Sequence, residues 1–234
     1  MTELAEAFRS AFALIVGLDR DLLEIVFLSL RVSLLALVPS VSIGVPLGAA
    51  IAIARFPGRR ALIALLNLGM ALPPVVVGLL VYLVLSRSGP LGRLGLLFTP
   101  GALVVGQTVL VTPLVAALSR QVLEDHWVEY RETLRSLGAR RGRAIATLVF
   151  EARHSLGTVL LAGFGRAITE VGVAIIVGGN INHLTRIMTT AIALQTSRGD
   201  LPLALGLGIV LLAVSLGVNA LALVAQEAVR RAEA

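Results

Sequence analysis

The sequence contains no lysine, so all 20 of its basic residues are arginines. A nucleotide-binding P-loop needs a lysine that reaches the terminal phosphates. The chain therefore cannot carry a standard P-loop ATPase site of its own. If ATP drives its function, a partner subunit must bind that ATP.

Cysteine is also absent, which excludes disulfides, thiolate metal sites and cysteine nucleophiles. The three histidines, His126, His154 and His183, are scattered along the chain, and neither zinc-ligand spacing nor a nucleophile elbow occurs. We therefore expect no catalytic residue, no metal and no bound cofactor, and we do not expect an enzyme.

Charged residues make up only 15% of the chain, whereas 57% of its residues are apolar. These proportions are typical of a membrane protein. The net charge of +6 comes from arginines clustered between apolar runs, without the interleaved aromatic residues of a base-stacking surface. Nucleic acid is therefore not an expected partner.

Five stretches have the length needed for a bilayer, which takes about 20 apolar helical residues. A shorter segment, 8–18, is expected to lie in the interface as an amphipathic helix. We expect an all-α integral membrane protein in which a lead-in, residues 1–20, precedes one transmembrane domain, residues 21–234. The five predicted spans are 22–54, 61–85, 101–119, 155–177 and 201–225.

The arginines of the connections predict their orientation, because cytoplasmic loops are enriched in arginine and lysine. Twelve arginines lie on one side of the membrane and six on the other. The N-terminus is therefore predicted outside and the C-terminus in the cytoplasm. The cytoplasmic set is Arg55, Arg59, Arg60, Arg120, Arg131, Arg135, Arg140, Arg141, Arg143, Arg153, Arg230 and Arg231, and the outer set is Arg9, Arg20, Arg87, Arg93, Arg186 and Arg198.

The longest connection, about 120–154, falls on the cytoplasmic side. Apolar residues recur in it at helical spacing, at Trp127, Tyr130, Leu134 and Leu137, and Gly138 follows where a helix would end in a left-handed turn. This pattern is typical of a docking element. A loop that merely fixes topology explains the arginines but neither the apolar stripe nor the glycine. Periodicity alone leaves both interpretations open.

The stretch ETLRSLG, residues 132–138, resembles the EAA loop of ABC importer permeases, whose pattern is Glu-Ala-Ala, three variable residues and Gly. Thr133 replaces the first alanine and Leu134 the second, and Phe150-Glu151 stands where the family has Leu-Pro. In that family the loop is a coupling helix that sits in a cleft of the ATP-binding subunit. The resemblance implies this role for Tyr130, Glu132, Leu134, Leu137, Gly138, Ala139 and Arg140.

Three further stretches resemble the molybdate and tungstate branch of these permeases. LPPVVVG at 72–78 is similar to the start of the second core span, while SRSGPLG at 86–92 and GFGRAITEVG at 163–172 are most like tungstate permeases. The resemblance implies the type I importer permease fold in the inner membrane. It further implies a second copy of the chain, two cytoplasmic subunits that bind ATP and Mg²⁺, and an external oxyanion-binding protein.

The function that this resemblance implies is ATP-driven import of an oxyanion, tungstate, by alternating access. A molybdate or sulfate permease is the alternative of the same class. A secondary transporter or channel would work without ATP, and a membrane scaffold would transport nothing. Only the ABC model requires the cytoplasmic loop to bind an ATPase.

Two charged residues of the fourth predicted span, Arg166 and Glu170, lie four residues apart and therefore on one helical face. They either line or gate a translocation path or form a neutralising pair that packs the dimer. The repulsion between an oxyanion and a fixed carboxylate favours the second interpretation. Further candidates for the path are Thr169, Asn180, Thr189 and Thr190.

The outer connection, 178–200, begins with Gly178, Gly179 and Asn180, which are expected to break the helix. A short amphipathic or re-entrant helix is predicted around 184–191. This segment would either contact the external binding protein or seal the helix bundle.

Overall fold

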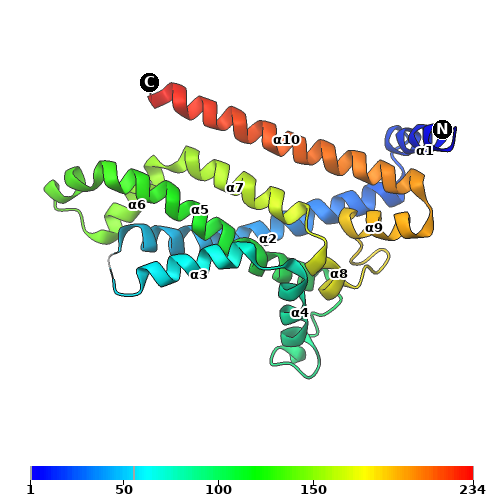
Figure 1. The fold of residues 1–234 in the computed structure, drawn as a ribbon, viewed down its shortest axis with the longest axis horizontal. Helices are drawn as coiled ribbons and strands as arrows, with labels where there is room; N and C mark the ends of the chain where they lie inside the picture. Colours follow the sequence, from blue (N-terminus) through cyan, green and yellow to red (C-terminus); the bar gives the residue numbers. More distant parts are fainter. Residues whose placement is uncertain (1, 55, 234) are drawn as a thin grey trace. The chain divides into compact units, whose positions relative to one another are not determined.

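The structure is a computed structural model that describes residues 2–54 and 56–233. Arg55 lies outside the described residues, and so do the side chains of Arg135, Arg141, Arg230 and Arg231. Every regular element in the described residues is a helix, which confirms the all-α prediction. The elements, shown in Figure 1, are α1 (Thr2–Val16), α2 (Arg20–Ile53), α3 (Arg59–Ala71), α4 (Pro74–Leu85), the 3₁₀ helix η1 (Gly92–Leu94), α5 (Pro100–Ser136), α6 (Arg141–Glu151), α7 (Arg153–Ile168), α8 (Gly172–Gly178), α9 (Met188–Arg198) and α10 (Leu201–Glu233).

The chain forms two compact units, each assembled from three separate stretches. Unit 1 contains Met1–Ala36, Pro73–Gln107 and Arg166–Gly217. Unit 2 contains Leu37–Leu72, Thr108–Gly165 and Val218–Ala234. Helices α2, α5, α7 and α10 contribute residues to both units.

Three described helices, α2, α5 and α10, are long and apolar enough to cross a membrane. Two broken helix pairs, α3 with α4 and α6 with α7, meet the same criterion when each pair is counted as one span. The expected five spans are therefore reached only by counting both pairs. Within unit 2, α6 and α7 are bent by 76° at their junction.

The predicted second span, 61–85, is wrong as a single helix because it breaks at Leu72 and Pro73. A residue that precedes proline is pushed out of the α region by the proline ring. Leu72 precedes Pro73, and Pro73 precedes Pro74, so both adopt extended backbone with ψ of 131° and 126°. Helix α4 then starts at Pro74, where the missing N–H costs no hydrogen bond.

Two other predicted boundaries are corrected. The fourth span, 155–177, is divided because α7 ends at Ile168 and α8 begins at Gly172. The third span was predicted to end at Ser119, but α5 continues to Ser136. The apolar pattern ends near Ser119, yet the charged stretch that follows keeps helical periodicity, so the connection 120–154 is mostly helix.

Glycines allow close helix packing in unit 1, where α8 lies against α4 (Figure 1). A Cβ atom on Gly78 of α4 would lie 3.0 Å from the Cα atom of Val173. A Cβ atom on Gly106 of α5 would overlap the side chain of the same valine. Small residues let backbones approach in the absence of a hydrophobic drive between helices in lipid. Gly78 therefore allows the backbones of α4 and α8 to lie close together.

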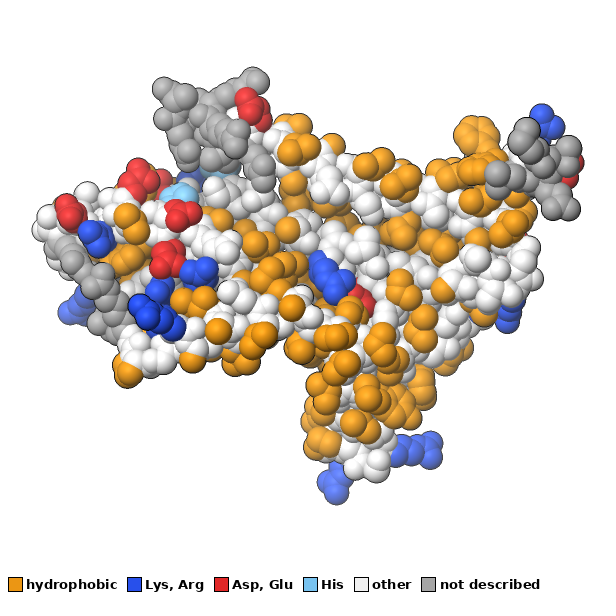
Figure 2. All heavy atoms as spheres, viewed as in Figure 1, with side chains coloured by type: hydrophobic (Ala, Val, Ile, Leu, Met, Phe, Trp, Pro, Cys, Tyr) orange, Lys and Arg blue, Asp and Glu red, His pale blue; other side chains and the backbone are white. Residues whose placement is uncertain are grey.

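Hydrophobic side chains cover α4, and basic side chains lie beyond its end (Figure 2). Arg87 and Arg93, in the segment after α4, are both exposed. An apolar surface with arginines at its end suits a helix in lipid, because arginine can extend its guanidinium to the polar interface. The exposed apolar residues of α4 are Val75, Val76, Leu79, Leu80, Leu83 and Val84.

The N-terminal segment forms α1, which starts earlier than the predicted helix at 8–18. Phe8, Phe12 and Val16 lie four residues apart and are exposed, whereas Ala7 and Ala11 are buried. One apolar face is therefore left uncovered. The predicted position of this helix in the membrane interface stays a prediction.

Candidate coupling and translocation sites

The predicted left-handed turn is present at Gly138, between α5 and α6 in unit 2. Gly138 has a φ of +65°, and the N–H of Ala139 donates to the carbonyl oxygen of Leu134 at 2.9 Å. This bond is the 6→1 hydrogen bond of a Schellman motif, which satisfies a carbonyl at the end of a helix. A Cβ atom at Gly138 would meet nothing within 4 Å. The backbone conformation, and not close packing within the chain, therefore requires glycine.

The apolar stripe before the turn is divided between the interior and the surface. Leu134 is only 8% exposed, and Ala144 and Leu148 of α6 are also buried. Leu137 is 76% exposed. Leu134 thus supports the packing of unit 2, while Leu137 is available to another molecule.

The other predicted coupling residues differ in how far they are exposed. Glu132 and Arg140 are exposed, whereas Tyr130 and Ala139 are half-buried. The Tyr130 ring stacks on His126 with the ring centroids 6.4 Å apart. The residues that a partner can reach most readily are therefore Glu132, Leu137, Gly138 and Arg140.

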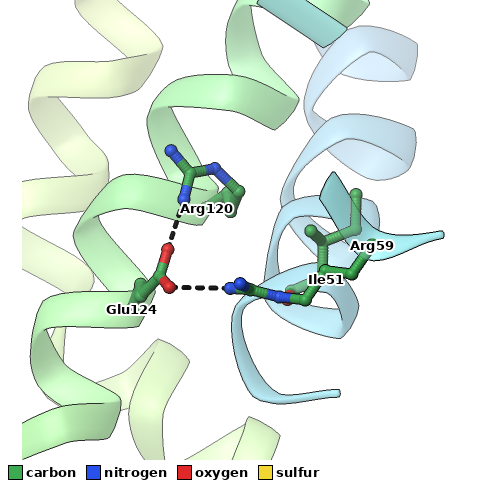
Figure 3. Close-up of polar contacts among 4 residues, drawn as sticks. All are labelled: Ile51, Arg59, Arg120 and Glu124. Atoms are coloured by element: carbon green, nitrogen blue, oxygen red, sulfur yellow. Dashed lines mark hydrogen bonds and ion pairs between the residues drawn. The ribbon is translucent and has the colours of Figure 1, made fainter. Parts of the chain in front are cut away.

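An ion cluster in unit 2 joins α3 to α5 (Figure 3). Arg59 Nη2 lies 2.7 Å from Glu124 Oε1, and Arg120 pairs with the other carboxylate oxygen. Arg59 Nε also donates to the carbonyl oxygen of Ile51 at 2.8 Å, close to the end of α2. The Glu124 carboxylate and the Arg59 guanidinium thus connect α2, α3 and α5. Glu124 lies twelve residues before the end of α5.

The break between α7 and α8 in unit 1 is built around Glu170, which is 2% exposed. Its Oε2 atom pairs with Arg166 Nη1 at 2.6 Å, which confirms that the two predicted residues interact. Its Oε1 atom accepts a hydrogen bond from the backbone N–H of Val173 at 3.2 Å. Thr189 Oγ1 donates to the Glu170 carbonyl oxygen at 2.8 Å. Both carboxylate oxygens are therefore satisfied by protein groups.

The outer connection breaks where predicted, with left-handed φ angles of +69° at Gly179 and +50° at Asn180. The short helix that follows, α9, begins at Met188, later than the predicted 184–191. Asn180 Nδ2 donates to the carbonyl oxygen of Thr190 at 3.3 Å, and Thr190 Oγ1 accepts from the N–H of Ile187 at 3.2 Å. Asn180, Thr189 and Thr190 are thus engaged in holding this segment, while Thr169 is exposed.

Two polar features were not identified as sites from the sequence. The pairing of Arg59 with Glu124 bridges 65 residues, so no local pattern indicates it. Gln107 is 1% exposed, and neither of its amide atoms has a hydrogen-bond partner among the described residues. The only signal for Gln107 in the sequence was that it is a single amide side chain within the apolar stretch of α5.

Residues 44–232 match the family model described as the binding-protein-dependent transport system inner membrane component. The chain belongs to this family. It is 39% identical over 227 residues to a tungstate uptake system permease protein of Peptoclostridium acidaminophilum, which covers 97% of this chain and all of that protein. It is 41% identical over 205 residues to a probable anion ABC transporter permease protein of Haloferax volcanii, covering 86% of this chain and 88% of that one.

A solved structure shares the fold of this inner membrane component. It is a bacterial alginate ABC transporter in complex with an alginate-bound periplasmic protein, and the match has a TM-score of 0.67 with 19% sequence identity. The match covers 99% of this chain and 88% of the other. Together with the apolar helices, the family identifies a multi-pass inner membrane protein with the fold of an ABC transporter membrane subunit.

Proposed function

We propose that the chain is the permease subunit of an ATP-driven importer of tungstate. The observation that carries this proposal is the similarity to a tungstate permease over the full length of that protein. The helices α5 and α6 and the left-handed turn between them support it, because an ATP-driven permease needs a rigid element for its ATPase. The chain itself has no lysine for a P-loop, so the ATP and Mg²⁺ belong to a partner subunit.

The proposed complex contains two copies of this permease, two cytoplasmic ATP-binding subunits and an external oxyanion-binding protein. ATP binding draws the two ATP-binding subunits together and moves the coupling surface formed by Glu132, Leu137, Gly138 and Arg140. The helices then open outward and accept the oxyanion from its binding protein. Hydrolysis and product release return the permease to the inward-facing state.

The pair formed by Arg166 and Glu170 keeps a broken helix neutral within the membrane. A charge at membrane depth is costly unless it is paired, and here the carboxylate is almost fully buried while the Arg166 side chain is 33% exposed. An approaching oxyanion therefore meets the guanidinium before the carboxylate. We propose that Arg166 borders the path and that Glu170 limits how strongly it holds the anion.

The test is uptake by purified complexes in vesicles, with the ATP-binding and oxyanion-binding subunits included. Tungstate, molybdate and sulfate are supplied separately, with and without ATP inside the compartment that holds the ATPase. We expect uptake that requires ATP and is fastest for tungstate. Faster uptake of molybdate or sulfate would change the substrate assignment, and uptake that is independent of ATP would overturn the proposal.

A further inference from the structure

Gln107 is a polar side chain buried in α5, which is one of the three described helices long and apolar enough to cross a membrane. Neither amide atom of Gln107 has a partner among the described residues, and Leu103, Leu110 and Val111 of the same helix are also buried. Within hydrocarbon no bulk water replaces a missing partner, so an unsatisfied amide is strongly unfavourable. Such a group requires an explanation other than folding stability.

The position of Gln107 follows from the packing of α5 on α8 in unit 1. Gly178, at the end of α8, approaches Leu103, and Val173, near its beginning, approaches Gly106. Residues later in α5 therefore contact residues earlier in α8. Gln107 lies one turn after Leu103 on the same face of α5, which brings it to the level of the break between α7 and α8.

The break at that level already carries polar groups, namely the Glu170 carboxylate and the Arg166 guanidinium. Glu170 is satisfied on both oxygens, as described above, whereas the Gln107 amide offers two unused N–H donors. A neutral donor can bind a doubly charged oxyanion without holding it as firmly as a fixed cation would. This combination suits a site that an anion enters and leaves.

We infer that Gln107 contacts the substrate during translocation and donates hydrogen bonds from its amide to the tetrahedral oxyanion. This inference rests on the proposed function and adds a named residue to its path. The amide, which has no partner among the described residues, is available to donate to that ion. Arg166 supplies a positive charge beside the path, and Gln107 supplies N–H groups that donate hydrogen bonds to the ion.

The experiment compares Gln107→Leu, Gln107→Asn and Gln107→Glu in the reconstituted complex with its ATP-binding and oxyanion-binding subunits. Loss of a hydrogen bond to a charged group predicts that Gln107→Leu slows ATP-dependent tungstate uptake about ten-fold or more. Gln107→Asn retains an amide and should keep part of the uptake, whereas Gln107→Glu should abolish it by repelling the anion.

Thermal unfolding separates this role from a structural one. Removing an amide that has no partner should leave the melting temperature of Gln107→Leu unchanged or raise it. Ser119→Ala is the matched control, because Ser119 is also a buried polar residue of α5 whose hydroxyl has no partner among the described residues. This control should transport tungstate at the wild-type rate.

Two results would overturn the inference while leaving the proposed function intact. One is wild-type uptake by Gln107→Leu, and the other is slow uptake accompanied by a lower melting temperature, which would indicate a structural amide held by water or by a second copy of the chain. A wild-type complex that takes up none of the three oxyanions would overturn both proposals.

Discussion

At the scale of single residues, a position can require glycine for its backbone conformation or for close packing, and only the first applies to Gly138 within the chain. Its φ of +65° lies in the left-handed region, yet the space around its Cα atom is open within the chain. Within the chain, a side chain at this position would be disfavoured by the left-handed backbone conformation and not by neighbouring atoms. Any steric limit would come from a bound partner.

Gly138→Val tests the backbone requirement. A β-branched residue in a left-handed conformation costs about 1–3 kcal/mol, so the turn should shift and the coupling surface should lose its geometry. We expect ATP hydrolysis to be uncoupled from tungstate uptake, or the ATPase to dissociate, while membrane insertion is normal. The measurement is uptake per ATP hydrolysed.

Gly138→Asn is the matched control, because asparagine tolerates the left-handed region better than other residues with a side chain. It should retain more coupling than valine. Normal coupling in Gly138→Val would contradict the assignment of the turn.

The carboxylate of Glu124 pairs with two arginines. Its removal should therefore lower the free energy of unfolding more than the loss of one surface ion pair would. Glu124→Ala leaves Arg59 and Arg120 partly buried without a counter-charge, with a cost of about 1–3 kcal/mol. A chain of this length should then melt about 2–4 °C lower for each kcal/mol lost. Glu129→Ala, an exposed acid on the same helix, should change the stability by no more than about 0.5 kcal/mol. Equal melting temperatures for the two variants would show that the cluster contributes little.

The residues that sequence reasoning identified were those with a local signal. Gly138 follows a helical stripe, and Arg166 and Glu170 are four residues apart, so both features could be predicted without coordinates. The direction in which Leu134 points could not, because periodicity defines an apolar face but not what covers it. The partners of Glu124 and the unsatisfied amide of Gln107 depend on contacts between distant segments.

At the scale of elements, the break before α4 and the break before α8 have different origins. The break before α4 follows from Pro73 and Pro74, whose rings exclude helical backbone at the preceding residues. The break before α8 has no proline. It is held by the Glu170 carboxylate on the Val173 N–H and by the Thr189 hydroxyl on the Glu170 carbonyl. Local sequence therefore specifies the first break. The second combines a local hydrogen bond, between Val173 and Glu170, with a tertiary hydrogen bond from Thr189.

A double-mutant cycle on Arg166 and Glu170 tests how far the second break depends on a neutral pair. Glu170→Ala removes both the cap and the counter-charge and should cost about 3–5 kcal/mol. Arg166→Leu should be similarly destabilising because it leaves a buried carboxylate alone. The double variant should be more stable than the sum of the two losses, by about 0.5–3 kcal/mol. Additive changes in the unfolding free energy would mean that the pair is not coupled.

At the scale of the whole molecule, hydropathy and loop charge predict an orientation that introduced cysteines can test. The chain has no native cysteine, so each new thiol is the only one available. Ser88, after α4, and Ser136, at the end of α5, are both exposed. A membrane-impermeant maleimide should label Ser88→Cys in intact spheroplasts and Ser136→Cys only after the membrane is disrupted. The reverse pattern would invert the predicted topology.

Composition and periodicity were enough to predict the helical class, the charged connection at about 120–154 and the starts of the five spans, each of which lies within two residues of a helix start. The broken spans could not be predicted in this way, because a hydropathy window registers apolar length without registering whether the backbone stays helical. The family similarity then identifies the kind of transport system, and its substrate is a matter for the uptake experiment.

The glycine contacts of α8 set its distance from its neighbours. The side chain of Val173 occupies the space that a Cβ atom at Gly106 of α5 would need, and the Cα atom of Val173 would lie 3.0 Å from a Cβ atom at Gly78 of α4. One added methyl group at position 106 would therefore force Val173 into another rotamer or move α8 away from α5, beside the break that Glu170 holds.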